Sequence, residues 1–116
     1  ARPEMLKVNI FMRGGWLAEA EISYAGFQAE ARARLAADIL RRRLSPALKL
    51  RVDLIGALSI FGDDSGKLLD SLPAGDGRDI RLRVATVHED RAVAERLLKE
   101  MNALYTCGPA GGTQPR

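Results

Sequence analysis

The sequence predicts an α+β two-layer sandwich, in which a four-stranded, mostly antiparallel sheet carries two helices on one face (ββαββα). Hydrophobic and polar residues alternate in four stretches, which is typical of half-buried strands. Two longer stretches repeat hydrophobic residues every three to four positions, as amphipathic helices do. The chain of 116 residues is long enough to bury the core of one domain.

The first two predicted strands form a β-hairpin. Residues 5–12 alternate hydrophobic and polar side chains, and residues 16–24 do the same. Between them, Arg13-Gly14-Gly15 supplies glycines that tolerate the positive φ angles of a tight turn. We therefore expect these two stretches to pair as neighbouring strands.

The first helix is predicted over residues 27–43. Hydrophobic side chains recur every fourth residue from Phe27 to Ile39. Three arginines, Arg41 to Arg43, occupy the last turn, where positive charge interacts favourably with the helix dipole. The following Ser45-Pro46 ends the helix, because the residue before a proline is disfavoured in helical conformation.

The second half of the chain repeats this order of elements. Residues 48–61 alternate as a third strand, and a loop with one short turn at residues 67–72 follows. Residues 80–84 alternate as a fourth strand. Asp90 is a suitable N-cap for a second helix, whose hydrophobic face runs through residues 94–105. Both helices can bury their hydrophobic faces only against the sheet, which predicts the two-layer arrangement.

The predicted domain covers residues 1–107, and residues 108–116 have the composition of a Gly/Pro-rich tail. The chain begins with Ala1-Arg2-Pro3 and shows no signal-peptide pattern, so we interpret it as the C-terminal domain of a longer cytoplasmic protein. Its apolar runs are too short to cross a bilayer, and we expect no membrane association. A single cysteine, Cys107, and a single histidine, His88, predict no disulfide framework, no metal site and no cofactor.

Basic residues on the predicted exposed sheet face are candidates for binding an anion. They are Lys49, Arg51, Arg81 and Arg83. The net charge is only +3, however, and no aromatic residues interleave with these positions as a base-stacking surface requires, so we do not expect a nucleic-acid partner. Acidic residues share the same face, which favours a solvated surface of ion pairs, with a docking surface for a missing domain or a partner subunit as the alternative.

Two further features are candidates for chemistry. His88 lies beside Glu89 and Asp90 between a strand and a helix, and could act as a general base with Glu19 or Glu21. A structural role at that junction is the alternative. Gly108, Pro109, Gly111 and Gly112 form a segment whose unobstructed backbone amides could contact an anion or a partner domain. The alternative is a helix stop that leads into a flexible tail.

Several sequence blocks occur in an order that resembles a known family. These blocks are Arg2–Val8, Glu19–Gly26, Arg51–Gly56, Ile80–Ala85 and Ala103–Gly112. The set resembles the C-terminal portion of the acyclic terpene utilisation protein AtuA family. The resemblance implies a part in bacterial catabolism of acyclic terpenes and branched acyl-CoA compounds. It also implies that the Gly-rich motif takes part in domain docking or anion contact.

From the residues and the resemblance together we expect a non-catalytic C-terminal domain that serves packing, oligomerisation or partner docking. The expected partners are the N-terminal portion of the parent protein or another subunit, and we expect a homo-oligomer. We expect no enzyme activity of this chain alone, while the parent is a candidate catabolic enzyme. Two alternatives stay open: an active site that contains His88 and the Gly-rich segment, and an anion- or nucleic-acid-binding module on the basic sheet face.

Overall fold

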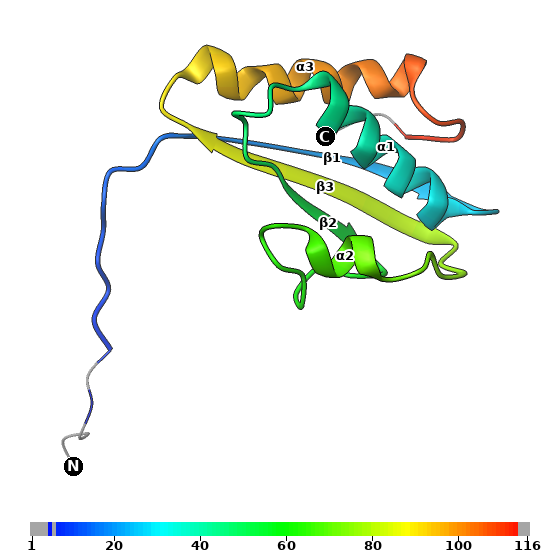
Figure 1. The fold of residues 1–116 in the computed structure, drawn as a ribbon, viewed down its shortest axis with the longest axis horizontal. Helices are drawn as coiled ribbons and strands as arrows, with labels where there is room; N and C mark the ends of the chain where they lie inside the picture. The colour runs from blue at the N-terminus through cyan, green and yellow to red at the C-terminus, as the bar shows by residue number, and fades with distance from the viewer. Residues whose placement is uncertain (1–4, 6, 114–116) are drawn as a thin grey trace.

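The computed structural model describes residues 5 and 7–113, which fold as an α+β domain (Figure 1). The elements in chain order are β1 (Trp16–Ala25), α1 (Ala29–Arg43), β2 (Arg51–Ile55), α2 (Lys67–Ser71), β3 (Asp79–His88) and α3 (Arg91–Cys107). The predicted α+β class, with an antiparallel sheet, is confirmed.

The sheet has three strands in the described part of the chain, in the order β1-β3-β2. The central strand β3 pairs antiparallel with both neighbours, with Trp16 opposite His88 at one end of β1 and Ala25 opposite Asp79 at the other. Because side chains alternate along a strand, even-numbered residues of all three strands lie on one face and odd-numbered residues on the other.

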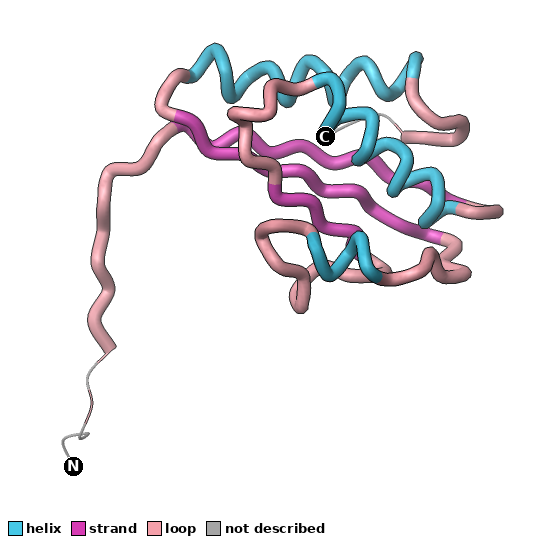
Figure 2. Tube along the Cα trace, in the orientation of Figure 1, coloured by secondary structure: helices cyan, strands magenta, loops and turns pink. Residues whose placement is uncertain are grey.

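Helices α1 and α3 pack on the same face of the sheet and against each other (Figures 1 and 2). The core lies between the two layers. Its largest fully buried side chains are Tyr24, Ile22, Leu40, Leu54, Ile80, Leu82, Leu97, Met101 and Val84. The predicted N-cap of α3 is confirmed, since the Asp90 carboxylate accepts a hydrogen bond from the backbone N–H of Ala92 at 2.8 Å.

The predicted first strand is wrong for the described residues. Residue 5 and residues 7–15 lie in neither helix nor strand, and the extended segment runs away from the sheet (Figures 1 and 2). The predicted hairpin turn at Arg13-Gly14-Gly15 does not form. Alternation shows that a segment could bury one face, but not which strand edge it will lie beside, and this segment lies beside none in its own chain. The sheet therefore has three strands where four were predicted.

The short turn predicted at residues 67–72 is the helix α2, so the described chain has three helices where two were predicted. A buried glutamate holds the loop around α2 against α1. Glu30 is only 4% exposed, forms an ion pair with Arg34 at 2.8 Å, and accepts a hydrogen bond from the backbone N–H of Gly75 at 2.9 Å. Arg34 in turn donates to the backbone carbonyl of Leu69 at 2.7 Å.

Candidate functional site

The sheet face that points away from α1 and α3 is the main candidate site, and we call it the outer face. It is formed by the odd-numbered residues of the three strands. Within the described chain neither long helix covers it. Its members are Leu17, Glu19, Glu21, Ser23, Arg51, Asp53, Ile55, Arg81, Arg83, Ala85 and Val87.

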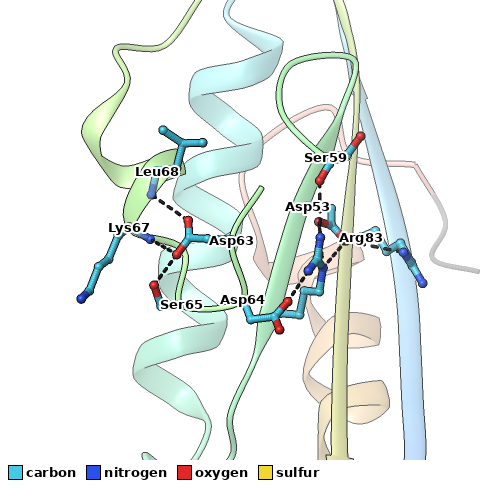
Figure 3. A network of polar contacts seen from close by, with 9 residues as sticks. Asp53, Ser59, Asp63, Asp64, Ser65, Lys67, Leu68 and Arg83 are labelled. Atoms are coloured by element: carbon cyan, nitrogen blue, oxygen red, sulfur yellow. Dashed lines mark hydrogen bonds and ion pairs between the residues drawn. The ribbon is translucent and has the colours of Figure 1, made fainter. Parts of the chain in front are cut away.

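Asp53 is the buried centre of this face (Figure 3). Its residue is 3% exposed, and its carboxylate pairs with Arg51 at 3.1 Å and with Arg83 at 3.5 Å. Arg51 also pairs with Asp64 and donates to the backbone carbonyl of Ser59. A buried carboxylate needs such partners, because loss of hydration without them would be costly.

The other arginines of the outer face are paired as well. Arg83 donates to Glu19, and this hydrogen bond lowers the pKa of Glu19 below its ordinary value. Arg81 forms an ion pair with Glu21 at 3.5 Å. Of the four predicted anion-binding residues, Arg51, Arg81 and Arg83 therefore share one network with carboxylates. Lys49 precedes β2, where its backbone carbonyl accepts a hydrogen bond from the Thr86 hydroxyl at 2.8 Å. Neutralised arginines of this kind are a poor electrostatic trap for a polyanion.

The neighbouring acidic loop is built to start a helix. The Asp63 carboxylate accepts hydrogen bonds from the Ser65 hydroxyl and from the backbone N–H groups of Leu68 (2.8 Å) and Lys67 (3.2 Å) (Figure 3). The bond from Ser65, followed by that from Leu68, lowers the pKa of Asp63 to about 2. Across the described residues, no group of three or more His, Cys, Asp or Glu side chains could hold a metal ion.

The Gly-rich segment is not an unpacked tail as far as Thr113, and residues 114–116 of the predicted tail lie outside the described residues. Gly112 forms a β-bridge with Tyr24 at the free edge of β1. Thr113 donates its backbone N–H to the Ser23 carbonyl at 2.9 Å, and the Thr113 hydroxyl accepts from the Ser23 N–H at 3.1 Å. A Cβ atom at Gly112 would come within 3.0 Å of Ile22, which explains why glycine suits this position.

Arg32 fixes the approach of this segment to the domain. Its guanidinium donates to the backbone carbonyls of Ala110 (2.6 Å), Phe27 (2.9 Å) and Ala25 (2.5 Å). The same group lies over the Tyr24 ring, 5.9 Å from its centroid. Burial raises the pKa of Tyr24 to about 12, against a smaller opposite effect of Arg32. The sequence analysis missed Arg32, because its three carbonyl partners come from distant segments and leave no local pattern.

The three parts of the alternative active site are not brought together. His88 lies on the helix side of the sheet, opposite Trp16, whereas Glu19 and Glu21 belong to the outer face. The Gly-rich segment meets β1 at Tyr24, eight residues and about 26 Å along the strand from Trp16. The His88 ring instead accepts a hydrogen bond from the backbone N–H of Asp90 at 3.0 Å, which is a structural role at the start of α3.

Comparison with known families agrees with this geometry of a small α+β domain. The family model described as "Acyclic terpene utilisation family protein AtuA" matches residues 1–116, the whole chain. The chain belongs to the AtuA family. This membership connects it with acyclic terpene utilisation. No curated protein and no protein of solved structure matches the AtuA chain. In the described part of the chain, none of the helices is both long and apolar enough to span a bilayer.

Proposed function

We propose that this AtuA-family chain is a non-catalytic assembly domain, which serves oligomerisation in the cytoplasmic breakdown of acyclic terpenes and branched acyl-CoA compounds. The observation that carries the proposal is the outer face. It is an uncovered surface of three strands whose polar side chains are already held in place by the Asp53 network. Ordered side chains lose little entropy on binding, which favours association over a freely solvated surface.

The partner that fits this face is a second copy of the chain. Arginines and glutamates alternate across the outer face, so two such faces related by a two-fold axis can place each sign of charge opposite the other. Next to the charges, Leu17 and Val87 lie opposite each other on neighbouring strands and are 66% and 59% exposed. A hydrophobic pair beside a paired polar network is the composition of a protein–protein interface.

Light scattering of the purified chain tests the proposal. We expect a mass of about twice the 12.7 kDa of the single chain at micromolar concentration. Val87→Lys should weaken the dimer about tenfold or more, because it places an unpaired charge in the interface. The matched control is Leu35→Lys, which adds the same charge at an exposed leucine of α1, away from the outer face.

The proposed self-association fails if the chain is a monomer at every concentration. It also fails at this face if Val87→Lys and Leu35→Lys dimerise as well as the unmodified chain. Binding to the N-terminal portion of an AtuA-family protein, with no self-association, would make the face an interdomain surface and overturn the homo-oligomer.

A further inference from the structure

The free edge of β1 is an unfilled position in the sheet. In the described chain β3 pairs with one side of β1, and Gly112 and Thr113 cover the other side only at Tyr24 and Ser23. Both backbone groups of Ser23 point to this free edge, since they bond to Thr113. Backbone direction alternates along a strand, so the N–H and C=O groups of Leu17, Glu19 and Glu21 point to the same edge.

Helix α3 leaves hydrophobic side chains above that edge. Glu100 faces α1, because it forms an ion pair with Arg43. Leu98 and Tyr105 lie roughly 160° and 140° around the helix from Glu100, on the flank away from α1. They are 39% and 55% exposed. Since α3 packs mainly on β1, this flank lies over the side of the sheet where a fourth strand would be added.

The segment of residues 7–12, which we call the arm, has the pattern that this position requires. It is extended and lies away from the sheet and helices (Figures 1 and 2). Its hydrophobic side chains are among the most exposed of the chain, with Ile10 at 79% and Phe11 at 93%. Val8, Ile10 and Met12 alternate with Lys7 and Asn9, so one side of the arm is apolar.

One antiparallel register between the arm and β1 satisfies all of these groups. Lys7, Asn9 and Phe11 then lie opposite Glu21, Glu19 and Leu17, whose backbone groups face the free edge. In this register the side chains of the outer face match, with Lys7 beside a glutamate and Phe11 beside an exposed leucine.

The same register also matches on the helix side. Val8 and Ile10 lie opposite Ala20 and Ala18, whose small side chains leave room for larger ones under the flank of α3. Shifting the register by one residue would turn the hydrophobic side of the arm toward solvent, so the alternation specifies this pairing.

We propose that the arm of one chain pairs with the free edge of β1 in a second copy of the chain, and that two copies exchange arms reciprocally. This inference rests on the proposed role in self-association, and it names the segment that carries it. Exchange of identical elements between copies is a common route to symmetric dimers, and addition of a strand to an open edge supplies backbone hydrogen bonds as well as side-chain contacts.

The path of the chain favours a second copy over its own edge. Gly15 continues the line of β1 past Trp16, and its backbone lies so close to β3 that a Cβ there would be 2.6 Å from the His88 carbonyl oxygen. Residues 13–15 therefore lead outward and do not reverse the chain, as pairing with its own β1 would require. The arm reaches away from its own body, in the direction from which another molecule approaches (Figure 1).

A cross-linking experiment between two variants tests the exchange. Both carry Cys107→Ser, which removes the exposed native thiol. One also carries Val8→Cys, and the other carries Ala20→Cys together with a mass tag. These positions face each other in the proposed register, at a separation that suits a disulfide. Under mild oxidation we expect a covalent heterodimer in the mixture, which a chain folded back on itself cannot form.

The matched control replaces Ala20→Cys by Ala18→Cys. Both alanines are 5% exposed, so they differ in register and not in burial. Formation of the heterodimer with Ala20→Cys at least five times faster than with Ala18→Cys supports the exchange. Equal rates, or no heterodimer at all, overturn it. A monomeric disulfide in a single chain with both Val8→Cys and Ala20→Cys, without heterodimer in the mixture, would show that the arm closes on its own edge.

A second pair of variants separates this inference from the proposed function. Ile10→Lys should weaken the dimer about tenfold without changing the unfolding of the monomer, because Ile10 lies outside the folded body. Asn9→Lys adds the same charge on the other side of the arm, opposite Glu19, and should keep the dimer. If Val87→Lys dissociates the dimer and Ile10→Lys does not, the outer face assembles the protein and arm exchange is wrong.

Discussion

Replacing Glu30 by alanine should be one of the most destabilising single changes near the surface of this domain. Glu30 is 4% exposed and lies in the first turn of α1, where its charge also interacts favourably with the helix dipole. The change removes the 2.8 Å ion pair with Arg34 and the 2.9 Å hydrogen bond from Gly75. Breaking a fully buried ion pair costs about 3 to 5 kcal/mol, because one charge stays buried without a partner.

The expected cost is below that range, for a reason visible in the structure. The Arg34 side chain is 20% exposed and keeps its hydrogen bond to the Leu69 carbonyl, so water and that carbonyl compensate part of the loss. We expect about 2 to 3 kcal/mol of lost unfolding free energy. For a domain of this size the midpoint of thermal unfolding should fall by about 10 °C.

The chain contains a matched control for this change. Arg91 and Glu95 form an ion pair with the same four-residue spacing on α3, but their side chains are 65% and 43% exposed. Glu95→Ala should cost no more than about 0.5 kcal/mol. Urea unfolding followed by circular dichroism gives both values. If Glu30→Ala costs no more than Glu95→Ala, burial does not strengthen this pair and the reasoning is wrong.

Three further predictions concern the two polar corners of the domain. Tyr24 should ionise near pH 12 in the folded chain, as the alkaline absorbance of the unmodified protein minus that of Tyr24→Phe will show. Because this pKa is raised from 10.0 by folding, its contribution to stability is complete below pH 10 and is lost as the pH rises to about 12; a Tyr24 signal that titrates at pH 10 contradicts the burial. Gly112→Val should release the C-terminal segment and accelerate amide exchange at Ser23, while Gly14→Ala, which meets nothing within 4 Å, should not. Asp63 has a folded pKa lowered to about 2, so its support of α2 should be present above about pH 4 and disappear as the pH falls toward 2, which the chemical shift of the Leu68 amide will report; no such change in Asp63→Asn is the control.

Most of the regular structure could be predicted from local patterns. Strands β1 and β3 and helices α1 and α3 carry clear periodicities, and the Asp90 cap has a signal of its own. These elements form because one side of each is hydrophobic, which is a property of the segment itself. The short α2 was also visible as a turn, although its Asp63 cap comes four residues before its first residue, Lys67.

The contacts that fix the candidate site could not be predicted in this way. Arg32 joins carbonyls at positions 25, 27 and 110, and Asp53 joins arginines at positions 51 and 83. No sequence spacing reveals such partners, because they depend on strand register and on where loops return. The Glu30–Arg34 pair is the exception, since its four-residue spacing on a helix is a recognisable signal.

The wrong hairpin and the unpaired edge of β1 have one physical origin. The sequence supplies four segments with the alternation of a strand, whereas the described chain pairs only three of them. A hydrophobic segment with period two gains its stability from a neighbouring edge, and an unfilled edge beside exposed Leu98 and Tyr105 gains from such a segment. Both needs are met by one contact, and alternation alone does not specify whether the edge belongs to the same molecule. In this chain the outward path through Gly15 favours an edge on another molecule, which makes the missing fourth strand a feature of assembly and not of the single domain.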